Sequence, residues 1–196
     1  MLSTTDAIVL ALQPLSDRAH LLHAYTRTCG RVNYKVYGLG RKHAMGLYNP
    51  LSILQITADQ LPNRIPSVRS AQLVHVSNST MVDARKQAIV LFISEVLYIT
   101  LRHPMEDKAL FDFIAESVKW LDSAEEPQNF HLQFLVGLAA QLGFAIDDTS
   151  NPDLLILPRT RAERQTQLQH LCAYFAEHVD SWQTPKSLEI LMEVFD

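Results

Sequence analysis

The spacing of apolar residues changes near residue 80, and this change limits the possible folds more than any other feature. Before it, five short runs of apolar and β-prone residues are separated by turn residues such as Pro14 and Gly30. Such runs are typical of short β-strands. Five strands in 80 residues predict a small barrel, and the oligonucleotide-binding (OB) type fits the count, with an SH3-like barrel almost as suitable. The runs are Ala7–Leu12, Leu21–Thr26, Val32–Tyr37, Ser52–Thr57 and Ser70–Val76.

Beyond this point the apolar residues recur at helical spacing, which predicts an all-α second half. Thr80 with Asp83, and Thr160 with Glu163, resemble capping boxes that begin helices. Gly143 is expected to end a helix that starts after Pro127. The predicted fold is therefore α+β, with an OB-type barrel domain at residues 1–79 and an α-helical domain at residues 80–196.

The charge is divided unevenly between these two halves. Residues 1–80 hold eight basic and three acidic side chains, a net charge of +5, whereas residues 81–196 hold nine basic and eighteen acidic ones, a net charge of −9. Such an asymmetry favours an anionic partner for the first half. A chance excess of basic residues on a solvated surface is the alternative.

Several classes of protein are disfavoured by the composition. No apolar stretch is long enough to cross a bilayer, and no basic region precedes the first apolar run, so a cytoplasmic protein is expected. Two cysteines, Cys29 and Cys172, are too few for a cysteine-rich zinc site. His20 and His23 are expected on opposite faces of a strand, which argues against a shared metal. We find no enzyme motif, and we expect neither catalysis nor a cofactor.

Basic and aromatic residues alternate in the segment from Tyr25 to Lys42, which holds five basic residues and three tyrosines. Basic side chains neutralise phosphates and aromatic rings stack on unpaired bases, so this segment favours single-stranded DNA. Strand alternation places Asn33, Lys35 and Tyr37 on one face, and Tyr34 and Val36 on the other. Tyrosines of a barrel core beside ordinary surface charges are the alternative. The candidate DNA-binding residues are Arg18, Arg27, Arg31, Lys35, Tyr37, Arg41 and Lys42, which we expect to line one basic surface.

The order of these motifs resembles the RecO family. The segments that carry the resemblance are Ala7–Leu10, Asp17–Leu22, Tyr25–Arg31, Val36–Lys42, Pro50–Leu54, Phe134–Leu138, Leu142–Phe144 and Leu188–Phe195. The resemblance implies an OB barrel followed by a helical domain. It also implies a non-enzymatic recombination mediator of DNA repair in the bacterial nucleoid. Such a mediator binds single-stranded and duplex DNA, anneals strands and assists recombinase loading.

The resemblance further implies two protein partners, a RecR-type protein and the acidic, apolar-ended tail of single-strand-binding protein. Such a tail needs a hydrophobic groove with a basic rim. The candidates for that rim are Arg102, Lys119, Arg159, Arg161 and Arg164. Many RecO relatives hold zinc with four cysteines after the Leu-Gly-Phe motif, but residues 145–160 contain none, so no zinc is expected. A protein-interaction adaptor without a DNA role is the main alternative, and a nuclease is a weaker one.

Overall fold

The computed structural model describes residues 2–39, 46–59, 64–75, 80, 82–147, 149 and 151–195. The chain divides into two compact units. The barrel unit comprises residues 1–77 together with residues 101–115, and the helical unit comprises residues 78–100 and 116–196. Among the described residues, no helix combines the length and apolar character required to span a membrane.

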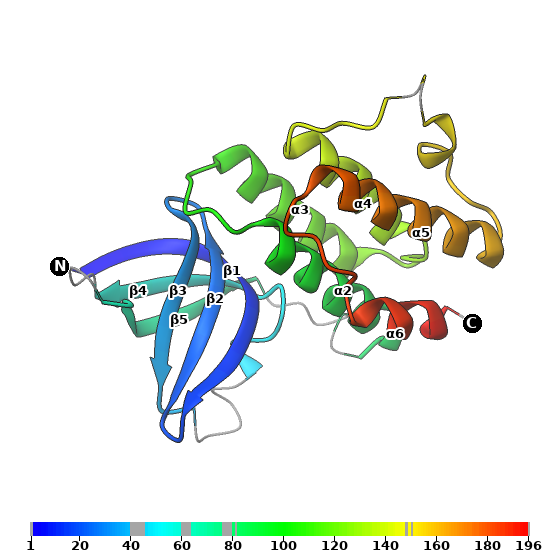
Figure 1. Cartoon of the computed structure of the whole chain (residues 1–196). Helices are drawn as coiled ribbons and strands as arrows, with labels where there is room; N and C mark the ends of the chain where they lie inside the picture. The colour runs from blue at the N-terminus through cyan, green and yellow to red at the C-terminus, as the bar shows by residue number, and fades with distance from the viewer. Residues whose placement is uncertain are drawn as a thin grey trace. The chain divides into compact units, whose positions relative to one another are not determined.

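Five strands of the barrel unit form a closed barrel in the order β1-β2-β3-β5-β4 (Figure 1). Neighbouring strands are antiparallel except β3 and β5, which pair in parallel where Lys35 lies opposite Ser67. This arrangement confirms the predicted five-stranded barrel and its OB type. The strands are β1 (Leu2–Ser16), β2 (Ala19–Thr26), β3 (Gly30–Tyr37), β4 (Ile53–Asp59) and β5 (Ser67–His75).

Strand β1 is longer than its apolar run predicts, because it pairs with two partners in turn. Residues 2–8 pair with β4 and residues 7–16 pair with β2, with a register shift between Val9 and Ala11. The irregularity lets the strand bend around the barrel. Pro14 does not end the strand, because that part of β1 pairs on one side only and a missing N–H is tolerated there.

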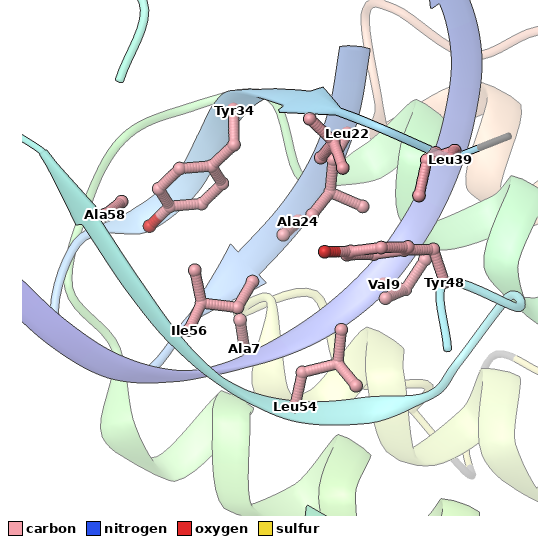
Figure 2. Close-up of a cluster of buried hydrophobic side chains, with 11 residues drawn as sticks. Ala7, Val9, Leu22, Ala24, Tyr34, Leu39, Tyr48, Leu54, Ile56 and Ala58 are labelled. Atoms are coloured by element: carbon pink, nitrogen blue, oxygen red, sulfur yellow. The ribbon is translucent and has the colours of Figure 1, made fainter. Parts of the chain in front are cut away.

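The barrel core consists of apolar side chains from alternate strand positions, together with Leu39 and Tyr48 from between β3 and β4 (Figure 2). Tyr34 and Val36 of β3 are buried in it, whereas Asn33 and Tyr37 are exposed and Lys35 is half-buried. This confirms the predicted distribution of β3 between two faces. The buried members of the core are Ala7, Val9, Leu22, Ala24, Tyr34, Val36, Leu39, Tyr48, Leu54, Ile56 and Ala58.

In the helical unit, α2 packs against α6 and α4 packs against α5. Helix α3 begins among the residues of the barrel unit and ends in the helical unit. The elements are α2 (Ala84–Thr100), α3 (Lys108–Ser123), α4 (Phe130–Gln141), the short 3₁₀ helix η1 (Pro152–Leu154), α5 (Arg161–His178) and α6 (Ser187–Val194).

The predicted helix ends are partly confirmed. Thr160 and Glu163 form a reciprocal capping box at the start of α5. Gly143 follows α4 with a φ of +88°, and the Phe144 N–H donates to the Ala139 carbonyl at 3.0 Å, as in a Schellman turn. The predicted box at Thr80 is wrong. Asp83 caps α2 instead, since its Oδ1 accepts from the Arg85 N–H at 2.8 Å.

Candidate nucleic-acid interface

The outer face of β3 and the β1–β2 turn bring three candidate residues to one end of the barrel. Lys35 lies opposite Leu21 of β2, and Tyr37 lies opposite Ala19. Arg18 directly precedes Ala19 in the exposed β1–β2 turn, so it lies at the same end as Tyr37. The Tyr37 side chain is 57% exposed. Within the part of the chain that the structure describes, Arg18 and Lys35 form no ion pair.

Arg27 lies at the opposite end of the β2–β3 pair, roughly 25 Å away along strands of eight residues. Its guanidinium forms an ion pair with Asp112 at the start of α3, and its Nε lies 4.0 Å from the carboxylate of Asp6. It also lies 4.9 Å from the centre of the Phe111 ring. These contacts join β2 to residues 101–115 within the barrel unit, so Arg27 has a structural role.

Arg31 is also engaged within the barrel unit. One terminal nitrogen donates to the Leu101 carbonyl at 3.0 Å, and the other lies 3.3 Å from Nδ1 of His23. Nδ1 of His23 lies 2.7 Å from Oδ1 of Asn33. Burial lowers the pKa of His23, the Arg31 charge lowers it further, and the bond with Asn33 opposes both. Arg31 therefore has the same outward direction as Lys35, but its guanidinium already has partners.

The three tyrosines of the basic segment have different surroundings. Tyr34 lies in the barrel core, where burial raises its pKa to about 12. Tyr25 is buried and stacks on Phe111, with ring centres 6.5 Å apart. Only Tyr37 of the three is free to stack on a base. The packing alternative therefore holds for Tyr25 and Tyr34.

Two predicted residues, Arg41 and Lys42, lie outside the described residues. The barrel unit carries two further arginines, which the sequence analysis counted in the net charge but did not name as DNA-binding candidates. Arg64 is exposed, and Arg69 of β5 pairs with Asp59. Among the described residues, no group of three or more His, Cys, Asp or Glu side chains is placed to hold a metal ion.

The helical unit contains a small apolar cavity with basic residues at its wall. Arg161 and Arg164, from the first turns of α5, line it together with Leu168, Leu191 and Phe195. The other predicted rim residues do not line it. Arg159 precedes α5, Lys119 pairs with Glu116 at 2.8 Å, and Arg102 belongs to the barrel unit.

His131 of α4 also lines this cavity, and sequence reasoning missed it. Its side chain is 3% exposed, and burial, together with the charge of Arg164, lowers its pKa to about 3. The imidazole is therefore neutral at physiological pH. In the sequence His131 is one polar residue among the apolar residues of the buried face of α4, so no local sequence pattern distinguishes it.

A closed OB-type barrel, with basic and aromatic side chains exposed on one strand, and a helical unit after it define a class of two-unit proteins. Residues 1–77 match the family domain described as "Recombination protein O N terminal", and residues 81–151 match "Recombination protein O C terminal". The chain belongs to the RecO family, whose members act in DNA repair and recombination.

Three relatives show the extent of this similarity. The DNA repair protein RecO of Bacteroides fragilis is 30% identical, over the full length of both chains. The protein of the same name from Porphyromonas gingivalis is 33% identical over 75% of this chain. That match spans 63% of the P. gingivalis protein, which is less than two thirds of its length. The RecO protein of Flavobacterium psychrophilum is 25% identical over 97% of this chain and 98% of its own.

Proposed function

We propose that the chain is a recombination mediator that binds single-stranded DNA on the outer face of β3 and promotes the annealing of complementary strands. The observation that carries this proposal is the shared position of Lys35, Tyr37 and Arg18 at one end of the barrel. Lys35 and Arg18 are suited to phosphates, and Tyr37 to an unpaired base. Arg41 and Lys42 follow β3 directly in the sequence and are proposed to extend this surface.

Annealing follows from the same chemistry without a catalytic group. A cationic surface that neutralises phosphates lowers the repulsion between two strands, and stacking on a tyrosine leaves the Watson–Crick edge of a base available. Duplex DNA is expected to bind the same surface through its phosphates alone. The family membership supports two further parts of this role, recombinase loading and a RecR-type partner. The proposed place of action is the DNA of the bacterial nucleoid.

The proposal is tested with two variants of β3 on a labelled single strand. Lys35→Glu is expected to weaken binding about tenfold and to reduce the salt dependence by about one phosphate contact. Tyr37→Ala removes a stacking platform worth about 1–3 kcal/mol, so it is expected to weaken binding roughly fivefold to a hundredfold. Strand annealing should fall in both variants.

Lys119→Glu is the matched control, because it changes the net charge equally but lies on α3 in the helical unit. Equal losses in Lys35→Glu and Lys119→Glu would show that only net charge matters and would refute the proposed surface. Wild-type protein that binds no DNA would support the adaptor alternative.

We further propose that the helical unit receives the acidic tail of single-strand-binding protein at the cavity between α4, α5 and α6. The basic side chains of Arg161 and Arg164 suit its carboxylates, and Leu168 and Leu191 suit an apolar end. Arg161→Glu is expected to weaken tail binding at least about tenfold while DNA binding is unchanged. Arg159→Glu is the control, since it adds the same charge two residues away without lining the cavity.

A further inference from the structure

A groove runs along one side of α5 in the helical unit. Two adjoining hollows form it, with free volumes of about 440 and 300 Å³, and both are lined by Asp153 and His170. The groove follows the helix from Ala162 to Glu177, over which an α-helix rises by about 22 Å. None of its lining residues lines the cavity proposed for the tail. The residues of α5 that recur every three or four positions, and so share the face at the groove, are Thr166, His170, Ala173 and Glu177.

The other wall of the groove is the segment 153–158, which Gln167 of α5 holds in place. Nε2 of Gln167 donates to the carbonyls of Leu154 and Ile156 at 2.8 and 3.0 Å. The Gln167 side chain is buried, and its Oε1 has no hydrogen-bond partner among the described residues. An unsatisfied buried acceptor is costly, so this wall favours a ligand that supplies N–H groups. The oxygen is covered, so a donor reaches it only when a neighbouring side chain moves.

The wider hollow presents apolar side chains to solvent. Ile156 and Leu157 line it and are 64% and 49% exposed, and Pro158 and Ala162 lie beside them in its wall. Large apolar side chains gathered at a hollow indicate a binding surface, because a partner that covers them removes apolar area from water. This part of the groove therefore suits a large apolar side chain of a ligand.

The charge of the groove is negative. Asp153 and Glu177 are exposed, and within the described part of the chain neither forms an ion pair. Glu163 also lines the groove, but its carboxylate already accepts from the N–H groups of Arg159 and Thr160. No lysine or arginine is among the described residues that line either hollow. The groove therefore favours a cationic ligand.

We propose that this groove docks a basic segment of a partner protein that also carries large apolar side chains. The apolar side chains occupy the hollow at Ile156 and Leu157, and lysine or arginine side chains approach Asp153 and Glu177. About seven extended residues span a groove of this length. The site is independent of DNA binding and of the tail cavity, since it uses neither the barrel nor the residues of that cavity.

The test uses the full-length chain and two fluorescein-labelled heptapeptides, Leu-Leu-Ser-Gly-Ser-Lys-Lys and Lys-Lys-Ser-Gly-Ser-Leu-Leu. Their C-termini are amides, so that no free carboxylate competes for the tail cavity. The two orders allow for either chain direction in the groove. Fluorescence anisotropy gives the affinities. At least one peptide is expected to bind at least about tenfold more tightly than its version with serine in place of leucine, because apolar burial is lost in that version.

Two variants, each with a matched control, assign the binding to the groove. Ile156→Ser should weaken binding of the better peptide at least about tenfold, whereas Val82→Ser, which also changes an exposed apolar residue but lies outside the groove, should not. Glu177→Lys should weaken it roughly fivefold, whereas Glu125→Lys, with the same change of net charge elsewhere in the helical unit, should leave it within about twofold. Unfolding temperatures should be unchanged, because all four side chains are solvent-accessible.

Three outcomes would overturn this proposal. The first is that neither peptide binds wild-type protein more tightly than its serine version, a comparison that needs no variant to fold. The second is that Glu177→Lys and Glu125→Lys weaken binding equally, since only net charge would then matter. The third is that wild-type protein self-associates in sedimentation velocity and that Ile156→Ser abolishes the association, which would assign the groove to a second copy of this chain. All three leave the proposed function standing.

Discussion

Gly30 and Met105 approach each other so closely that no side chain fits between them. Gly30, at the start of β3, has a φ of +62°, and a Cβ added to it would lie within 2.9 Å of three backbone atoms of Met105. The neighbouring Arg31 N–H donates to the His103 carbonyl at 3.4 Å. The glycine therefore allows residues 101–105 to lie against the edge of β3 within the barrel unit.

Gly30→Ala is expected to destabilise the protein by roughly 2–4 kcal/mol, because it combines a left-handed backbone with a clash against main-chain atoms that cannot rotate away. Gly38→Ala is the matched control. Its φ is +75°, but nothing lies within 4 Å of the added Cβ, so a loss of only about 1 kcal/mol is expected. Urea unfolding measures both, and equal losses would contradict the close approach.

Glu95 of α2 accepts hydrogen bonds from Ser187 at the start of α6, and this interaction can also be tested. The Ser187 hydroxyl donates to the Glu95 carboxylate at 2.6 Å, and its N–H donates at 2.9 Å. Burial raises the pKa of Glu95, but the hydrogen bonds from Ser187 and Lys186 outweigh burial and hold it below its ordinary value. The ionised form is therefore the one that stabilises the helical unit.

This stabilisation is fully present above pH 4.5, the ordinary pKa of glutamate in the unfolded chain. It is lost as the pH falls from there through the lower pKa that Glu95 has in the folded protein. Glu95→Gln should lower stability at pH 7 by about 1 kcal/mol, as the loss of a helix cap does, and by less near pH 3. Glu125→Gln is the control for charge alone, since Glu125 is exposed. A Glu95→Gln deficit of the same size at both pH values would be inconsistent with this account.

His131 predicts a separate loss of stability at mildly acidic pH. Its pKa in the folded protein is about 3, against an ordinary value of 6.5. Below pH 6.5 the imidazole is therefore protonated in the unfolded chain but stays neutral in the folded chain. Stability should fall by about 1.4 kcal/mol per pH unit in this range, or roughly 2 kcal/mol between pH 7 and pH 5. Unfolding curves at several pH values measure it. His131→Gln should reduce this dependence without abolishing it, because the pKa of His23 is also lowered in the folded protein. The exposed control His103→Gln should keep it in full.

The purified protein is expected to contain far less than one zinc ion per chain. Its two cysteines differ in surroundings: Cys29 is exposed, whereas Cys172 is buried and burial raises its pKa to about 11. A tetrahedral zinc site normally needs four good ligands. Elemental analysis after dialysis measures the content, and stoichiometric zinc would reveal a site formed from histidines and carboxylates.

The fold was predictable where it depends on local periodicity. Strand alternation alone places Tyr34 in the core and Lys35 with Tyr37 on the outer face, because the side-chain period of a strand is two. The capping box at Thr160 was predictable for the same reason, since all of its atoms lie within four residues. The sequence could not show that Asp83 rather than Thr80 caps α2, because both side chains offer a suitable oxygen. The Thr80 N–H instead donates to the carboxylate of Asp122, which lies 42 residues further along the chain.

The candidate site was predictable only in part, because its remaining features depend on distant contacts. Arg27 and Arg31 are basic residues near tyrosines, which is the pattern of a DNA contact. Their partners, Asp112 and Leu101, lie 85 and 70 residues further along the chain. Nothing in the local sequence shows that these arginines are already engaged. Nδ1 of His131 has no hydrogen-bond partner among the described residues, and this too depends on distant contacts, because α4, α5 and α6 meet around it.

The most direct test of the proposed function is the salt dependence of wild-type binding to single-stranded DNA. If the basic surface of the barrel contacts about four phosphates, the logarithm of the affinity should fall against the logarithm of the salt concentration with a slope near −3. Lys35→Glu should make that slope shallower by about 0.7. An affinity that does not change with salt, or no binding at low salt, would contradict the assignment of DNA binding to this barrel.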